Sequence, residues 1–116
     1  MGDISDLQQR VIAFRDARNW KQFHNHKDLA ISLVLEASEL LEHFQWKTPE
    51  EIKTHLTTHK SEVSDELADV LYWLLLMAHD LEIDLQEAFV HKLAKNETKY
   101  PVNKARNNHK KYTELS

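Results

Sequence analysis

The sequence predicts an all-α fold, and three observations support that prediction. The chain of 116 residues contains one Gly and two Pro, whereas the tight turns and bulges of sheet proteins usually recruit glycine. Apolar residues recur every three or four positions along four stretches, which is the periodicity of amphipathic helices. The length is that of one ordinary domain. We therefore expect residues 1–116 to form a single domain, a four-helix bundle with a basic C-terminal tail at about 101–116.

Local signals mark where these helices begin and end. Asp28 and Asp84 are candidate N-caps for the second and fourth helices. Thr48 and Pro49, followed by two glutamates, have the form of an N-cap and a first helical turn, which indicates a short linking helix. Pro101 should end the fourth helix. The expected helices cover about residues 3–18, 28–44, 60–79 and 84–99. Their wide apolar faces predict that a partner chain completes part of the core.

The composition excludes several classes of protein. There is no cysteine, so disulfides and thiolate metal sites are excluded. The net charge of −4 gives no overall reason to bind nucleic acid. The segment from Lys99 to Lys111 is basic, and it either meets phosphates or, more simply, is a solvated terminus. No apolar run reaches the roughly 20 residues of a membrane span, and no signal peptide is recognised, so we expect a cytoplasmic protein.

Two helices carry acids on the face that should be buried. In the second helix Glu36 falls between apolar positions and Glu39 lies on the shoulder of the same side. Glu66 and Asp69 repeat this arrangement on the third helix. If the two helices pack antiparallel, four carboxylates converge, and a hard cation such as Mg²⁺ or Mn²⁺ would relieve their repulsion. The alternative is that one or both pairs reach water beside the core.

The fourth helix adds two polar residues to its apolar stripe. Lys92 and Asn96 lie one turn apart there. They either contact an anionic ligand, or Lys92 pairs with one of the acids while Asn96 is satisfied within the core. The residues alone do not separate these two interpretations.

The two acidic pairs also carry a resemblance. Glu36-Ala-Ser-Glu39 and, after 26 intervening residues, Glu66-Leu-Ala-Asp69 resemble the E-x-x-E and E-x-x-D motifs of MazG-like pyrophosphohydrolases. The flanking residues resemble the compact dCTP pyrophosphatase branch of that family, from about residue 7 to the end of the chain. The resembling segments are Trp20–His24, Glu36–Trp46, Asp65–Tyr72, Lys99–Pro101 and Lys110–Leu115. The resemblance implies Mg²⁺-dependent hydrolysis of dCTP or a related dNTP to a nucleoside monophosphate and pyrophosphate, for nucleotide-pool control or house-cleaning.

The resemblance further implies roles for single residues. The metal ligands would be Glu36, Glu39, Glu66 and Asp69, of which Glu39 and Glu36 would also act in catalysis. The phosphate-binding residues would be Lys92, Asn96, Lys99 and Tyr100. The base- and sugar-binding residues would be His24, Trp46, Tyr72, Phe23 and Trp20. Trp73 is expected in the core or an interface instead, and His43, His55, His59, His79, His91 and His109 at the surface or in an interface.

The resemblance also implies a homodimer or homotetramer, because MazG-like domains pair helices across a two-fold axis with sites near the subunit interface. Two alternatives stay open. One is a related all-α hydrolase that acts on dUTP, dUDP or phosphoribosyl-ATP. The other is a non-catalytic helical interaction module, which loss of any of the four acids would have favoured.

Overall fold

The computed structural model describes residues 3–115, and every regular element in that range is a helix. The predicted all-α fold class is confirmed. In chain order the elements are α1 (Ile4–Ala17), η1 (Lys21–Phe23), α2 (His26–Glu42), α3 (Pro49–Asp80), α4 (Leu85–Lys99), α5 (Val102–Ala105) and η2 (Tyr112–Glu114). None of the described helices is both long and apolar enough to cross a membrane. The chain divides into two compact units, Met1–Ile83 and Asp84–Ser116.

Short polar side chains begin the long helices. Asp3, Thr48 and Asp84 each accept a hydrogen bond from the backbone N–H three residues later. The predicted caps at Thr48 and Asp84 are thereby confirmed. At α2 the cap is Asn25, whose Oδ1 accepts from the Asp28 N–H at 2.9 Å, so Asp28 lies in the first turn instead. Asn25 serves because its side-chain oxygen satisfies an N–H that has no partner within the helix.

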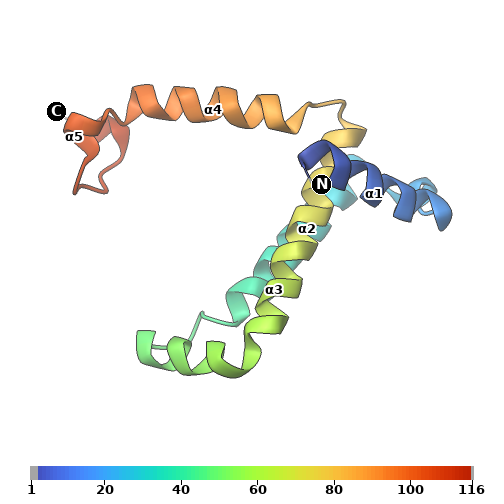
Figure 1. Cartoon of the computed structure of the whole chain (residues 1–116), viewed down its shortest axis with the longest axis horizontal. Coiled ribbons are helices and arrows are strands. Elements are labelled where there is room, and N and C mark those ends of the chain that lie inside the picture. Colours follow the sequence, from blue (N-terminus) through green and yellow to red (C-terminus); the bar gives the residue numbers. More distant parts are fainter. Residues whose placement is uncertain (1–2, 116) are drawn as a thin grey trace. The chain divides into compact units, whose positions relative to one another are not determined.

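The linking helix and the third long helix of the sequence prediction form one continuous helix, α3, of 32 residues. Figure 1 shows that the N-terminal part of α3 runs in a different direction from the rest. In this part Thr57 Oγ1 donates to the Thr54 carbonyl oxygen at 2.6 Å. Thr58 Oγ1 donates to the His55 carbonyl oxygen at 3.4 Å. Hydroxyls that bond to backbone carbonyls in this way compete with the helical hydrogen bonds and often bend a helix.

The core of the first unit forms where α3 packs along α2 and against α1 (Figure 1). Leu29 from α2 and Leu75 and Leu76 from α3 are each at most 1% exposed. Other large apolar side chains of α2 remain open to solvent, with exposed fractions of 45–63% at Ile31, Val34 and Leu35. Completion of the core by a partner chain stays a prediction, and these side chains are where it would act.

A buried polar cluster joins α1 to the end of α3. Arg15 is fully buried, and its guanidinium donates to both carboxylate oxygens of Asp80, each at 2.8 Å. Its Nη1 also lies 3.4 Å from Nδ1 of His24. The hydrogen bonds from Arg15 hold the pKa of Asp80 below its usual value. Burial, together with the Arg15 charge, lowers the pKa of His24. Asp80 is therefore ionised and His24 neutral at pH 7.

The second unit contains α4, α5 and η2. Within it, Lys99 Nζ lies 4.8 Å from the centroid of the Tyr112 ring. The rings of Tyr100 and Tyr112 meet edge-on with centroids 6.2 Å apart. A cation–π contact and an aromatic pair thus hold η2 against the end of α4.

Candidate functional site

The four acids marked in the sequence are neighbours in the first unit. Burial raises the pKa of Glu36 above its usual value. The other three carboxyl groups, Glu39, Asp69 and Glu66, raise it further. Because such effects fall with distance, the other three carboxylates lie within electrostatic range of Glu36.

Two oxygens of this group are buried: Glu36 Oε2 has no hydrogen-bond partner among residues 3–115, whereas Glu66 Oε2 lies 2.5 Å from His43 Nε2. A buried, unpaired carboxylate oxygen is costly, and a hard divalent cation is the partner that suits an all-oxygen set. The donor chemistry therefore fits Mg²⁺. In the described part of the chain, no three His, Asp or Glu side chains already converge tightly enough to hold an ion. Glu39 and Asp69 are exposed, so their side chains are free to turn inward.

A cavity of about 660 Å³ opens beside these acids, and Glu36 and Asp69 lie in its wall. The rest of its lining is largely apolar and includes aromatic rings. Phe14 meets Trp20 edge-on with ring centroids 5.8 Å apart, and meets Tyr72 edge-on at 6.0 Å. This volume is typical of small-molecule sites. The cavity can therefore take a flat ring against the aromatic surfaces and a charged group near the acids.

Some of the predicted binding residues gather in this cavity. Trp20 and Tyr72 both line it. Trp73, expected in the core or an interface, lines it as well, with its ring centroid 5.0 Å from that of Tyr72. Sequence reasoning missed Arg10 and Phe14 as lining residues. Phe14 had a detectable signal, because it ends the apolar stripe of α1 on the side that turns toward Trp20.

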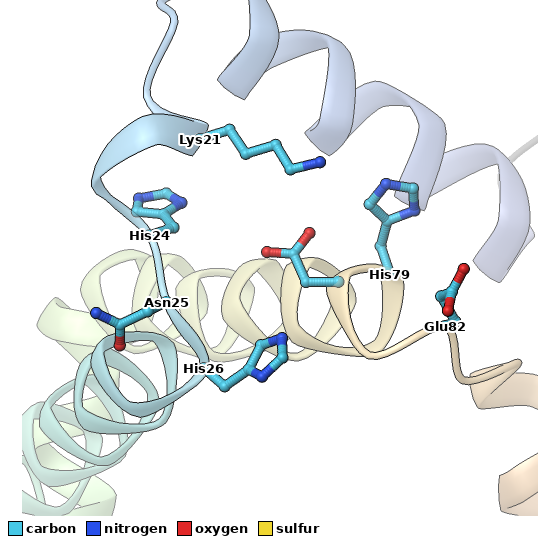
Figure 2. A pocket seen from close by; sticks show the side chains of 7 residues that line it. Lys21, His24, Asn25, His26, His79 and Glu82 are labelled. Carbon is cyan, nitrogen blue, oxygen red and sulfur yellow. The ribbon is translucent and has the colours of Figure 1, made fainter.

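The other residues predicted for the base or sugar lie elsewhere. His24 lines a second pocket, of about 420 Å³, where η1, the start of α2 and the end of α3 meet. Figure 2 shows the Lys21 side chain extending from η1 across this pocket toward His79. Phe23 and Trp46 are 69% and 86% exposed and line neither of these two pockets. Their contact with a base stays a prediction.

The predicted phosphate-binding residues belong to the second unit. Asn96 and Lys99 are half-buried on α4, whereas Lys92 on α4 and Tyr100 just after it are exposed. All four follow one another along the last two turns of the helix and its end. Their contact with phosphates stays a prediction.

Three of the histidines expected at the surface or in an interface form a row that begins at Glu66, and their place in an interface stays a prediction. His43 Nε2 lies 2.5 Å from Glu66 Oε2, and His43 Nδ1 lies 2.8 Å from Nε2 of His55. The rings of His55 and His59 stack with centroids 4.2 Å apart and planes 7° from parallel. The sequence held a signal for His43, which follows Glu36 by seven residues and so falls on the same side of the helix two turns later.

Comparison with known proteins gives a consistent family. The model of the MazG-like family matches residues 31–115, which include all four acids. The chain is 36% identical over 114 residues to dCTP pyrophosphatase 1 of Homo sapiens and 35% identical over 114 residues to that of Mus musculus. Each alignment covers 97% of this chain and 67% of the relative. A crystal structure of a pyrophosphatase from Archaeoglobus fulgidus DSM 4304 matches with 41% identity and a TM-score of 0.79, over 87% of this chain and 94% of that chain.

Proposed function

The chain belongs to the MazG-like family and is a nucleotide pyrophosphohydrolase, and on that premise we propose that it hydrolyses a deoxynucleoside triphosphate with the help of Mg²⁺. The observation that carries the proposal is the aromatic cavity with Glu36 and Asp69 in its wall. A base fits against the rings while the triphosphate extends toward the acids. We take dCTP as the first candidate, because the curated relatives are named for that substrate.

The proposed reaction begins when a water oxygen attacks the α-phosphorus. The bond from that phosphorus to the oxygen shared with the β-phosphate then breaks, and this oxygen leaves with pyrophosphate. The ligands for Mg²⁺ would be Glu36, Glu39, Glu66 and Asp69. When bound, Mg²⁺ neutralises phosphate charge and lowers the pKa of water. Glu39, which is exposed and adjoins Glu36, accepts the proton of the attacking water.

The proposal includes a second copy of the chain. A shallow apolar pocket of about 290 Å³ lies over Ile31, Val34 and Leu35 on α2, and these side chains are among the exposed ones. A homodimer or homotetramer would cover them, and Lys92 and Asn96 are the proposed contacts for the phosphates. A sedimentation mass equal to one chain would remove this part of the proposal.

The test is pyrophosphate release from standard dNTPs and NTPs and from modified cytosine nucleotides. Each is assayed with Mg²⁺, with EDTA, and with Mg²⁺ restored after EDTA. We expect metal-dependent release of pyrophosphate, matched by an equal amount of nucleoside monophosphate, with the highest kcat/KM for a cytosine deoxynucleotide. Nucleoside diphosphates are the matched control, because their hydrolysis yields phosphate and no pyrophosphate. No turnover of any triphosphate by folded, Mg²⁺-loaded protein would refute the proposal.

Replacing Trp20 by Ala should raise KM for the preferred dNTP and change kcat less. Stacking of a base on an aromatic side chain contributes about 1–3 kcal/mol, so the expected rise is about 5- to 150-fold. Trp20→Phe is the control, because it keeps an aromatic surface in the cavity. Steady-state kinetics of both variants decide the matter. An unchanged KM in Trp20→Ala would contradict a base site in this cavity, and equal losses in both variants would contradict stacking as the cause.

A further inference from the structure

A line of contacts runs from Glu66 through two histidines to the bent part of α3. His43 directly follows α2, and His55 belongs to the N-terminal part of α3. His43 Nε2 lies 2.5 Å from Glu66 Oε2, and His43 Nδ1 lies 2.8 Å from His55 Nε2. The side chains of His43 and Glu66 are 11% and 23% exposed. The contact is thus mostly shielded from water, where electrostatic interactions are stronger than at a free surface.

An ionised carboxylate can only accept hydrogen bonds, and this identifies His43 as the donor in its contact with Glu66. Ionised Glu66 can only accept, so His43 presents its Nε2–H to it. His43 Nδ1 and His55 Nε2, 2.8 Å apart, share a second hydrogen bond in which one nitrogen donates and the other accepts. Burial and the neighbouring His59 lower the pKa of His55, which agrees with a neutral ring in this role. His43 therefore fixes the orientation of the Glu66 carboxylate, and His55 fixes the orientation of the His43 ring.

The contact with Glu66 leaves that carboxylate able to bind a cation. His43 Nε2 lies 2.5 Å from Oε2, and an ionised carboxylate offers about four lone-pair positions on its two oxygens. The imidazole thus restricts where the carboxylate lies and leaves its other lone pairs for a cation. Groups behind the ligands of a metal ion act in this way, because they reduce the freedom of a ligand to swing away.

His55 lies in the N-terminal part of α3, which runs in a different direction from the rest of the helix (Figure 1). The Thr57 and Thr58 hydroxyls bond to backbone carbonyls where the N-terminal part of α3 turns. His59, one turn after His55, stacks on its ring, and His59 Nδ1 lies 2.7 Å from Thr58 Oγ1. The bent segment therefore places His55 against His43, and the stacked ring holds it there.

We propose that His43 is a positioning residue that fixes the Glu66 carboxylate for the divalent cation, and that His55 holds His43 in the required orientation. This inference rests on the proposed function, because it concerns the same cation. It adds to the four acids two residues that touch neither substrate nor cation. Their substitution should weaken binding of the cation itself, before any nucleotide is present.

The test is Mn²⁺ binding to the nucleotide-free protein, measured by calorimetric titration or by the loss of the free Mn²⁺ electron-paramagnetic-resonance signal. His43→Leu should weaken Mn²⁺ binding by about 10- to 100-fold, the usual effect of removing a group behind a metal ligand. His43→Gln should restore most of the affinity, because its amide N–H₂ can take the place of Nε2–H. His55→Leu should weaken binding less than His43→Leu does. His109→Leu, at an exposed position of the second unit, is the control and should bind as wild type does.

The outcomes separate this inference from the proposed function. Wild-type binding with unchanged affinity in His43→Leu and His55→Leu would overturn the positioning role and leave the proposed function standing. No Mn²⁺ binding by the wild type would overturn both the metal requirement and this inference. Circular dichroism of each variant checks its fold. If His43→Leu does not fold, the other two variants still decide: a loss of Mn²⁺ affinity of about 10- to 100-fold in His43→Gln would contradict an oriented N–H donor at residue 43, and wild-type affinity in His55→Leu would contradict the role of His55.

Discussion

Replacing Glu36 by Gln should reduce kcat/KM for the preferred dNTP by about a thousandfold, which corresponds to about 4 kcal/mol of transition-state stabilisation. Glu36 lies in the wall of the aromatic cavity, and its Oε2 is buried without a partner among the described residues. An amide of the same shape lacks the charge that a cation requires. Initial-rate measurements of pyrophosphate release at several Mg²⁺ concentrations give the loss directly.

The same substitution should not destabilise the metal-free protein. The pKa of Glu36 is raised in the folded state, so its ionisation costs stability as the pH rises through that pKa. Glu36→Gln removes this cost, and thermal unfolding in EDTA at pH 7–8 should show a variant at least as stable as the wild type. Glu42→Gln, on an exposed part of α2, is the control for activity. Full activity in Glu36→Gln would contradict a metal-binding role for this carboxylate.

Replacing Asp80 by Asn should lower the free energy of unfolding by about 3–5 kcal/mol, because it leaves the buried Arg15 guanidinium without a counter-charge. For a domain of this size the loss corresponds to a fall in Tm of about 10–25 °C. Urea and thermal unfolding measure it. The double variant Arg15→Met, Asp80→Leu should lose less than Asp80→Asn, because no unpaired charge remains. A double variant less stable than Asp80→Asn would contradict this account.

The Arg15–Asp80 pair also predicts a pH dependence. The folded-state pKa of Asp80 lies below the ordinary value of 3.8. Its contribution is therefore fully present above about pH 4 and is lost as the pH falls through the lowered folded-state pKa. Unfolding free energies measured between pH 5 and pH 2 should fall less steeply in Asp80→Asn than in the wild type.

The helices could be predicted because their signals are local. The Thr48–Pro49 start, the Asp84 cap and the stop at Pro101 each depend on a few adjacent residues. The acidic pairs were also detectable, since three-residue spacing places two side chains on one face of a helix. The predicted start of α2 was wrong, because Asn25 and Asp28 are both good N-cap residues and only the path of the chain selects one. The predicted break between the linking helix and the third long helix was also wrong, because α3 bends there and does not end.

The surroundings of the acids could not be predicted in the same way. The cavity places Trp73 beside Tyr72 and opposite α1, and that depends on how α1 packs on α3. The contact of His43 with His55 depends on the bend of α3. Arg15 is polar and lies on a helix, so periodicity suggests exposure, whereas its pairing partner Asp80 is 65 positions away. Long-range contacts of this kind leave no spacing that a sequence pattern can detect.

The way α2 joins α3 has a consequence for the order of folding. The two helices are consecutive and pack along each other, so the contacts that gather the acids close only a short loop of chain. Docking of α1 depends on pairs such as Arg15 with Asp80, which lie 65 positions apart. Such pairs close a much longer loop of chain and therefore cost more chain entropy. The hairpin of α2 and α3 should therefore be formed in the folding transition state, with α1 joining later. Loss of the Arg15–Asp80 pair would then speed unfolding and leave the folding rate nearly unchanged, so the acidic cluster takes shape before the cavity beside it closes.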